Sequence, residues 1–350
     1  MKDYREITEN VLRRRDEYEI KKKRRYERIH KARSILSVIV VVTVFLFTAG
    51  TCYVFAVGFG LINDTFGICG KIFPGYITQK QQSYVYSTAV DIGDAVTCNE
   101  IKVTAQSAIT DGTTAYILLR IEAPEQMDLT QYGLHFDIAT NGIIRGENPS
   151  SVLGAGAFGL QQRIVEDQDG AKNTQDMVIQ IDSAGKPGSA FSFADGYNRY
   201  VLLENLYVRN ADIPNEKIRI AEGNWNFRIL FDNTDCMIQK EMLTEPIQLT
   251  AYRKLEDTEQ AVIVRSIVVK GLSMEFYYAT EDETIRKPGK FQDVKVVLLD
   301  GTIIDMQSRS GQGTGSDIFA VYLASSPIIV EEIDYVQVGD VKIHSGAVRN

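Results

Sequence analysis

The sequence predicts a mainly β protein, with a cytoplasmic helix and one transmembrane helix at the N-terminus and two β-sandwich domains after them. Three observations support this prediction. Residues 34–63 contain no charged side chain, and the charged residues just before them are mostly basic. The remainder of the chain alternates apolar and polar residues over short runs parted by Gly, Asn and Asp. Such runs are typical of antiparallel sheets and not of βαβ units.

The charge is distributed unevenly along the 350 residues. Residues 1–33 hold 13 Lys and Arg against 7 Asp and Glu, a net charge of +6. The remaining residues hold 25 against 39, a net charge of −14, and the whole chain has −8. A basic head on an acidic body indicates two parts that face different surroundings.

Residues 34–57 are the predicted transmembrane helix. Fourteen of these 24 residues are Val, Ile, Leu or Phe, and a helix of this length extends about 36 Å, enough to cross a hydrocarbon core of about 30 Å. One alternative is a buried core helix, although core helices rarely remain uncharged over such a length. The other is a signal peptide cleaved after Val54-Phe55-Ala56, whose head would then be unusually long.

A block of basic residues directly precedes this run. Positive charge beside a transmembrane helix stays on the cytoplasmic side, so we expect a cell-membrane protein with its N-terminus inside and residues beyond about 60 outside. Anionic lipid headgroups would attract the same block. Nucleic acid is not an expected partner, because the block has no aromatic platform or reader motif. The membrane-flanking basic residues are Lys21, Lys22, Lys23, Arg24, Arg25, Arg28, Lys31 and Arg33.

The head itself is predicted to be helical over residues 4–29, which are rich in Glu, Lys and Arg and lack Gly and Pro. Ile7, Val11 and Leu12 are aliphatic residues among these charges. They are candidate partner-binding residues, because an amphipathic helix can place such side chains in a groove of another protein. The alternative is a polar juxtamembrane helix with a few isolated apolar residues.

Residues 58–87 are predicted to be a linker, and residues 88–240 the first extracytoplasmic β-sandwich. The clearest signal in this sandwich is a hairpin, in which residues 100–107 and 113–122 flank the turn dipeptide Asp111-Gly112. Further strands are expected at 134–140, 176–182, 205–209 and 224–232.

Residues 241–350 are predicted to form the second sandwich, with the break between the two sets of strands at about 235–246. Asp300-Gly301 indicates another hairpin within it. Residues 308–316, with the sequence SRSGQGTGS, are rich in Gly and Ser and are expected to form a mobile hairpin tip.

The sequence contains no catalytic motif that we recognise: no Gly-rich phosphate loop, no Gly-x-Ser-x-Gly and no His-Glu-x-x-His. His135 is expected to be a half-buried strand residue, and Trp225 a core residue. Asp232-Asn-Thr-Asp235 offers oxygen ligands to calcium but lacks the spacing of a dedicated loop, so a turn is expected there. We therefore expect no enzymatic activity, no cofactor and no metal site.

The cysteines Cys69, Cys98 and Cys236 lie in the part predicted to be outside, and Cys52 lies in the predicted span. Three outer cysteines allow one bridge at most. A bridge from Cys69 to Cys98 would close a loop of about 30 residues and add about 3–4 kcal/mol if it were unstrained. The alternative is three separate thiols.

The order of these features resembles a known family. It consists of a basic head, one span, an alternating strand, an Asp-Gly turn, the segment TTAYILLRIEA at 113–123, and Gly223-Asn-Trp225-Asn-Phe227 near the end of the first domain. This order resembles the extracytoplasmic domain-of-unknown-function family 4179 of membrane-tethered, anti-sigma-factor-like proteins of Gram-positive bacteria.

The strands after residue 246, with Leu299-Asp300-Gly301 and Tyr335-Val-Gln-Val-Gly-Asp340, resemble the immunoglobulin-like domain that often follows this family. The resemblance covers most of residues 60–348. It implies immunoglobulin-like sandwiches and a role in envelope sensing or sigma-factor control, and it supplies no catalytic residues. The head is shorter than the cytoplasmic domain of the best-understood anti-sigma factors.

Two classes of function follow from these expectations. The first is an anti-sigma-factor-like envelope sensor or regulator, whose head binds a cytoplasmic sigma factor and whose outer domains bind an unknown envelope ligand or protein. The alternative is a membrane-anchored surface adhesion or envelope-scaffold protein without signalling.

Overall fold

The computed structural model describes residues from 68 onward, with gaps. The predicted head and transmembrane helix lie outside the described residues, and within them no helix has both the length and the apolar character needed to span a bilayer. Internal contacts divide the chain into Met1–Asp64 and Thr65–Asn350, and every described residue belongs to the second unit. The described ranges are 68–75, 77–130, 133–145, 158–165, 170–183, 193, 198–209, 217–231, 238–253, 258–280, 289–314 and 317–345.

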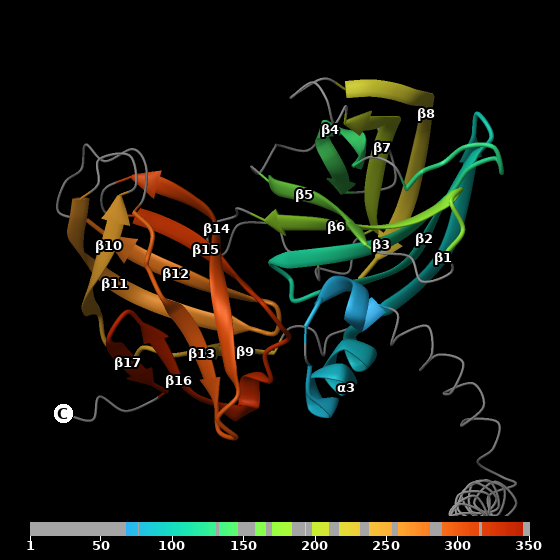
Figure 1. The fold of residues 1–350 in the computed structure, drawn as a ribbon. Coiled ribbons are helices and arrows are strands. Elements are labelled where there is room, and N and C mark those ends of the chain that lie inside the picture. The colour runs from blue at the N-terminus through green and yellow to red at the C-terminus, as the bar shows by residue number, and fades with distance from the viewer. Residues whose placement is uncertain are drawn as a thin grey trace, which may run out of the picture. The chain divides into compact units, whose positions relative to one another are not determined.

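The described part is mainly β, which confirms the predicted class (Figure 1). All of its strand pairings are antiparallel. Short helices lie at 68–72, at α3 (Gln79–Thr88) and at η2 (Val330–Glu332). The strands are β1 (Val90–Cys98), β2 (Ile101–Thr110), β3 (Thr114–Glu122), β4 (Leu134–Arg145), β5 (Phe158–Val165), β6 (Thr174–Ser183), β7 (Asn198–Arg209), β8 (Lys217–Leu230), β9 (Gln239–Glu241), β10 (Ile247–Arg253), β11 (Thr258–Lys270), β12 (Ser273–Ala279), β13 (Val294–Leu298), β14 (Ile303–Thr314), β15 (Asp317–Ala324), β16 (Ile333–Val338) and β17 (Val341–His344).

Two sheets share the first core, and we call them the first sheet pair. Among the described residues, one sheet has the order β1-β2-β3-β6-β5 and the other the order β4-β7-β8. Buried side chains of both sheets form one apolar cluster. Trp225 on β8 belongs to it, donates its indole N–H to the Ile101 carbonyl on β2 at 3.0 Å, and packs edge-on against Phe136 of β4. The prediction that Trp225 is a core residue is confirmed.

The Asp111-Gly112 hairpin is confirmed, since β2 pairs with β3 on either side of it. One carboxylate oxygen of Asp111 accepts the backbone N–H groups of Thr113 and Thr114 at 3.0 and 2.8 Å. Gly112 has φ +87°, a left-handed conformation that favours glycine. The side chain and the glycine together therefore fix the turn, as the dipeptide predicts.

The second core is enclosed by a continuous set of strands, which we call the second sheet assembly. Among the described residues its order is β10-β11-β12-β15-β14-β13-β16-β17, with β9 paired to β11. The first residues of β14 pair with β13 and the later ones with β15, so β14 joins two groups of strands around one apolar cluster. The Asp300-Gly301 hairpin is confirmed between β13 and β14, with the Asp300 carboxylate accepting the Thr302 N–H at 2.9 Å.

The expectation of a mobile tip at 308–316 is wrong for residues 308–314. These residues belong to β14 and pair with β15 from Ser308 to Thr314. A β-carbon on Gly313 would lie 2.0 Å from the backbone oxygen of Asp317, and Gly313 has φ +109°. The glycine thus permits a close approach of the two strands. In the sequence, a glycine that serves this purpose cannot be told apart from a glycine in a loop.

The predicted linker at 58–87 contains helical structure where the structure describes it. Thr78 and Gln81 form a capping box: the Thr78 hydroxyl accepts the Gln81 N–H at 3.3 Å, and the Gln81 side chain accepts the Thr78 N–H at 2.9 Å. We name residues 68–75 and 77–88 the helical segment. They bury apolar side chains such as Phe73 and Val85 against the sheet β1-β2-β3-β6-β5, on the face that points away from the first core and is called its outer face here. This burial, and not local periodicity, holds the segment in place.

Candidate functional site

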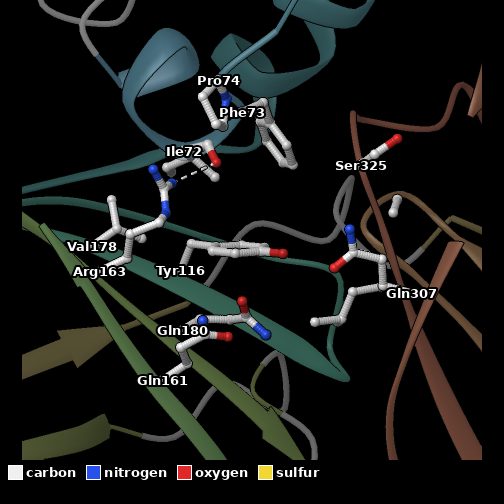
Figure 2. Close-up of a pocket in the computed structure, with 12 residues that line it drawn as sticks. Ile72, Phe73, Pro74, Tyr116, Gln161, Arg163, Val178, Gln180, Gln307 and Ser325 are labelled. Carbon is white, nitrogen blue, oxygen red and sulfur yellow. Dashed lines mark hydrogen bonds between the residues drawn. The ribbon is translucent and has the colours of Figure 1, made fainter. Parts of the chain in front are cut away.

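A pocket of about 300 Å³ lies where three parts of the chain meet (Figure 2). The helical segment contributes one wall, the outer face of β3, β5 and β6 a second, and β14–β15 with the residue that follows them a third. The lining residues are Ile72, Phe73 and Pro74 of the helical segment, then Tyr116, Gln161, Arg163, Val178 and Gln180, then Gln307, Leu323, Ala324 and Ser325.

Tyr116 is the aromatic residue of the sheet wall. Its side chain is buried, and its ring meets Phe73 edge-on with centroids 5.7 Å apart. Burial, reinforced by the charges of Asp182 and Asp111, raises the pKa of the Tyr116 hydroxyl above its ordinary value. The hydroxyl therefore stays protonated at neutral pH and can donate a hydrogen bond.

Arg163 fastens the helical segment to the sheet. One terminal nitrogen of its guanidinium donates to the backbone carbonyls of Lys71 and Ile72 at 2.7 and 2.9 Å. These carbonyls lie at the end of the short helix at 68–72, where the helix itself provides no N–H donor for them. Lys71 adds an ion pair with Asp176 of β6. Burial lowers the pKa of Arg163, although a guanidinium remains charged at any physiological pH.

Asp182, near the end of β6, is a buried carboxylate two residues from Gln180 of this wall. Its carboxylate accepts from the Gln180 amide at 3.2 and 3.3 Å and pairs with Nε of Arg309 at 2.9 Å. Burial raises the pKa of Asp182, and the hydrogen bonds from Gln180 and Arg309 oppose that shift. The carboxylate is thus buried and compensated by neighbours.

A buried carboxylate joins the first sheet pair to the second sheet assembly beside this wall. While one oxygen of Asp111 closes its own turn, the other accepts the Leu272 N–H at 3.1 Å and the Ser273 hydroxyl at 2.6 Å. Ser273 is the first residue of β12, and Leu272 directly precedes it. The junction therefore has a directional, buried hydrogen-bonded contact and not only apolar packing.

Lys270 and Glu275 extend the junction. Lys270 donates to a Glu275 carboxylate oxygen and to the Thr113 hydroxyl, both at 2.6 Å. Tyr277 donates its hydroxyl to the other Glu275 oxygen at 2.7 Å. Burial and the Glu275 charge raise the pKa of Tyr277, so it remains a donor. Each charge of this group has an opposite charge or a donor beside it.

The helical segment also contacts the second sheet assembly directly. The buried Gln81 amide donates to the Pro327 carbonyl at 2.6 Å and to the Ser326 hydroxyl at 3.1 Å. Lys80 pairs with Glu332 of η2. Leu272 completes the apolar cluster beneath the helical segment. One stretch of about 20 residues therefore touches both strand systems.

The residues considered for chemistry in the sequence occupy structural positions. His135 is buried on β4 and stacks on Tyr207 with ring centroids 5.5 Å apart, so it is more buried than expected. Cys69 and Cys98 are free thiols and form no bridge with each other. Within the described ranges no cluster of His, Cys, Asp or Glu could hold a metal ion. Asp232–Asp235 and Cys236 lie outside those ranges.

The predicted partner-binding and membrane-flanking residues cannot be compared with the pocket, because all of them precede residue 68. Ile7, Val11, Leu12 and the basic block at 21–33 lie outside the described residues. Sequence reasoning missed the pocket itself. Its residues are separated by more than 200 positions, and only the capping box at Thr78 hinted at the helical wall.

No family model matches the chain, and no curated protein matches it. Among solved structures, the chain is similar to one described as "The crystal structure of the conserved domain protein from Bacillus anthracis". The identity is 14%, the TM-score is 0.45, and the match covers 71% of this chain and 75% of that one.

Proposed function

We propose that this chain is a single-pass membrane protein that acts as an anti-sigma-factor-like envelope sensor or regulator. In this proposal residues 1–33 are a cytoplasmic head, residues 34–57 cross the cell membrane, and the two strand systems are extracytoplasmic immunoglobulin-like sandwiches. The proposal assigns binding and no catalysis to the outer part. The asymmetric charge and the uncharged run in the sequence support the topology.

The position of the helical segment is the observation that best supports a regulatory function. It begins about ten residues after the predicted span, and it is packed on the first sheet pair through Phe73 and hydrogen-bonded to the second sheet assembly through Gln81. A rearrangement of either strand system would therefore change the contacts of the chain closest to the membrane. A protein that serves only as an anchor has no need of such a connection.

The antiparallel pairing and the two cores favour the sandwich assignment. In the first sheet pair, opposed sheets contribute alternating buried residues to one cluster. In the second sheet assembly, β14 connects two groups of strands around another cluster. Such layers joined by strands that bend between them are known in sandwich folds.

The head is the proposed effector. An amphipathic helix that buries three aliphatic side chains gains about 1.5–3 kcal/mol from each before ordering costs, which suits a weak and reversible complex. The test is the double substitution Ile7→Asp and Val11→Asp. It should release a sigma factor or similar regulator from the head in a pull-down and raise transcription of the protein's own operon.

The control is Thr8→Asp with Asn10→Asp, which adds the same charge and keeps the aliphatic residues. It should leave partner recovery unchanged. If Ile7→Asp with Val11→Asp alters neither partner recovery nor transcription, the regulatory function is wrong. The alternative of a membrane-anchored surface adhesion or envelope-scaffold protein then takes its place.

A further inference from the structure

Asp182 points toward the second sheet assembly and not into its own core. Ile181, the preceding residue on β6, belongs to the apolar cluster of the first core. Side chains alternate along a strand, so Asp182 lies on the outer face. There its carboxylate meets Nε of Arg309 on β14 at 2.9 Å, and the residue is 0% exposed. Figure 2 shows the same face, with Gln180 of β6 and Gln307 of β14 lining one space. The two strand systems together therefore exclude water from this carboxylate.

A second buried carboxylate, Asp111, lies near Asp182, on the other side of Thr114. The Thr114 N–H donates to Asp111 at 2.8 Å, and the Thr114 hydroxyl donates to Asp182 at the long distance of 3.5 Å. Like charges so close together disfavour the ionised state. Burial raises the pKa of Asp182 most strongly, the Asp111 charge adds to this shift, and the hydrogen bonds from Gln180 and Arg309 oppose it. Compared with the same group in water, Asp182 therefore binds a proton more readily.

The other ionisable groups around this place have different partners. Arg163 of β5 donates to two backbone carbonyls of the helical segment, and Lys270 of β11 donates to Glu275 of β12. Tyr116 of β3 stays protonated at neutral pH, because burial raises its pKa. In the part of the chain that the structure describes, the cation bound to Asp182 is therefore Arg309 alone, and it binds through a single nitrogen.

Asp182 also has the longest hydrogen bonds of the carboxylates at this junction. Each oxygen of Asp111 accepts two hydrogen bonds, and both oxygens of Glu275 accept hydrogen bonds at 2.6 or 2.7 Å. The bonds from Gln180 to Asp182, in contrast, measure 3.2 and 3.3 Å. A proton that enters the junction therefore meets the least competition from other donors at Asp182.

We propose that docking of the two strand systems takes up one proton at Asp182, so that the junction between them tightens as the pH falls. The protonated carboxyl still accepts from Gln180 and Arg309, and the cost of burying its charge is removed. Docking is therefore favoured at low pH, and it loses this contribution as the pH rises through the pKa of the docked carboxyl. A role of external pH as a signal rests on the proposed function, whereas the proton uptake itself does not.

Hydrogen exchange at the Leu272 N–H measures the docking. This buried N–H donates to Asp111 across the junction at 3.1 Å, so it exchanges when the contact opens. The purified full chain, in detergent micelles, is exchanged between about pH 8 and about pH 4.5, above the ordinary pKa of an aspartate in water. Peptides that contain Leu272 are followed by mass spectrometry. The protection factor, which corrects for the intrinsic pH dependence of exchange, should increase as the pH falls, by at most about tenfold per pH unit for one proton.

Variants assign the proton to Asp182. Asp182→Asn keeps the shape of the side chain and cannot take up the proton, so the ratio of the wild-type protection factor to that of Asp182→Asn should rise at least about threefold over this pH range. The control is Asp305→Asn, the same exchange at an exposed position of β14, and it should follow the wild type. Arg309→Gln removes the cation that opposes protonation, so its protection should begin to increase at a higher pH than in the wild type.

A ratio that does not change with pH would show that docking takes up no proton at Asp182, and it would overturn the proposal. A ratio that decreases as the pH falls would overturn it as well, because the ionised pair with Arg309 would then dominate. If Asp182→Asn does not fold, Arg309→Gln decides, since an unchanged pH dependence in that variant contradicts the proposal. These measurements use purified protein, so their failure is distinct from failure of the sigma-factor proposal, which is measured by transcription and partner recovery.

Discussion

The carboxylate of Asp111 accepts a hydrogen bond from the Ser273 hydroxyl at 2.6 Å. This contact joins the turn between β2 and β3 to the first residue of β12, across 162 positions of sequence. Because the same carboxylate also closes its own turn, one side chain supports both a hairpin and the junction between the two strand systems.

Asp111→Ala should destabilise the protein by about 3–4 kcal/mol. The change removes four hydrogen bonds to a buried carboxylate and leaves buried donors such as the Leu272 N–H unsatisfied. Urea unfolding followed by fluorescence of Trp225, the only tryptophan of the chain, measures the loss. Asp300→Ala is the matched control, since Asp300 also precedes a turn glycine but is exposed and outside the junction. Equal losses in the two variants would show that the junction contributes nothing.

Gly271→Ala should loosen the contact between the helical segment and β12. A β-carbon at Gly271 would lie 1.7 Å from the Tyr84 hydroxyl oxygen, so the α3 side chain must move. Overpacking of this kind costs about 1–3 kcal/mol. In a Tyr84→Ala background the same substitution should cost less, and a double-mutant cycle measures the difference. Gly75→Ala, with no atom near its β-carbon, is the control. Strict additivity would contradict the contact.

The two hairpins could be predicted because their turns contain the dipeptide Asp-Gly, which is rare in other backbone conformations. Asp111-Gly112 and Asp300-Gly301 each combine a side chain that accepts turn N–H groups with a glycine at positive φ. The turn between β1 and β2 is also short, but it is made by Asn99 and Glu100, with φ 47° and 65°. Glutamate gives no signal for a left-handed turn, so β1 was not predictable.

The pocket was not predictable for a different reason. Alternation along β3 places Tyr116 and Leu118 on one face and Ile117 and Leu119 on the other, and both faces are buried. Nothing local in the strand indicates what covers the second face. The cover comes from the helical segment, whose capping box at Thr78 was a visible start signal for a helix. The face of the sheet on which this segment packs is determined by contacts between residues that are far apart in the sequence.

Cys69 should be an unreactive thiol in the folded protein. It belongs to the helical segment, its side chain is buried in the apolar cluster there, and burial raises its pKa from 9.0 to about 11. About one thiol in a thousand is then ionised at pH 8, and the thiolate is the nucleophile. We compare two single-cysteine chains, one retaining Cys69 and one retaining the partly exposed Cys98. A thiol reagent at pH 8 should label the second much faster, and the Cys69 rate should rise steadily with pH toward 11.

Denaturation supplies the control for both chains, because each must then label fully. In the unmodified protein, four free thiols are expected after denaturation without reductant, one for each cysteine. Two missing thiols would reveal a bridge, and a bridge that includes Cys69 or Cys98 would contradict their free state in the structure. Fast labelling of native Cys69 at pH 8 would contradict its burial.

The predicted topology can be tested at two engineered positions in a chain whose natural cysteines are replaced. Glu125→Cys lies in an exposed position between β3 and β4, and Thr8→Cys lies in the head. A membrane-impermeant maleimide should label Glu125→Cys in intact cells, and it should label Thr8→Cys only after permeabilisation. The physical reason for this expectation is the basic block at 21–33. The membrane potential opposes outward movement of positive charge, so we expect the block to keep the head on the cytoplasmic side. Labelling of Thr8→Cys in intact cells would reverse the orientation, and it would also remove the head from reach of any cytoplasmic sigma factor.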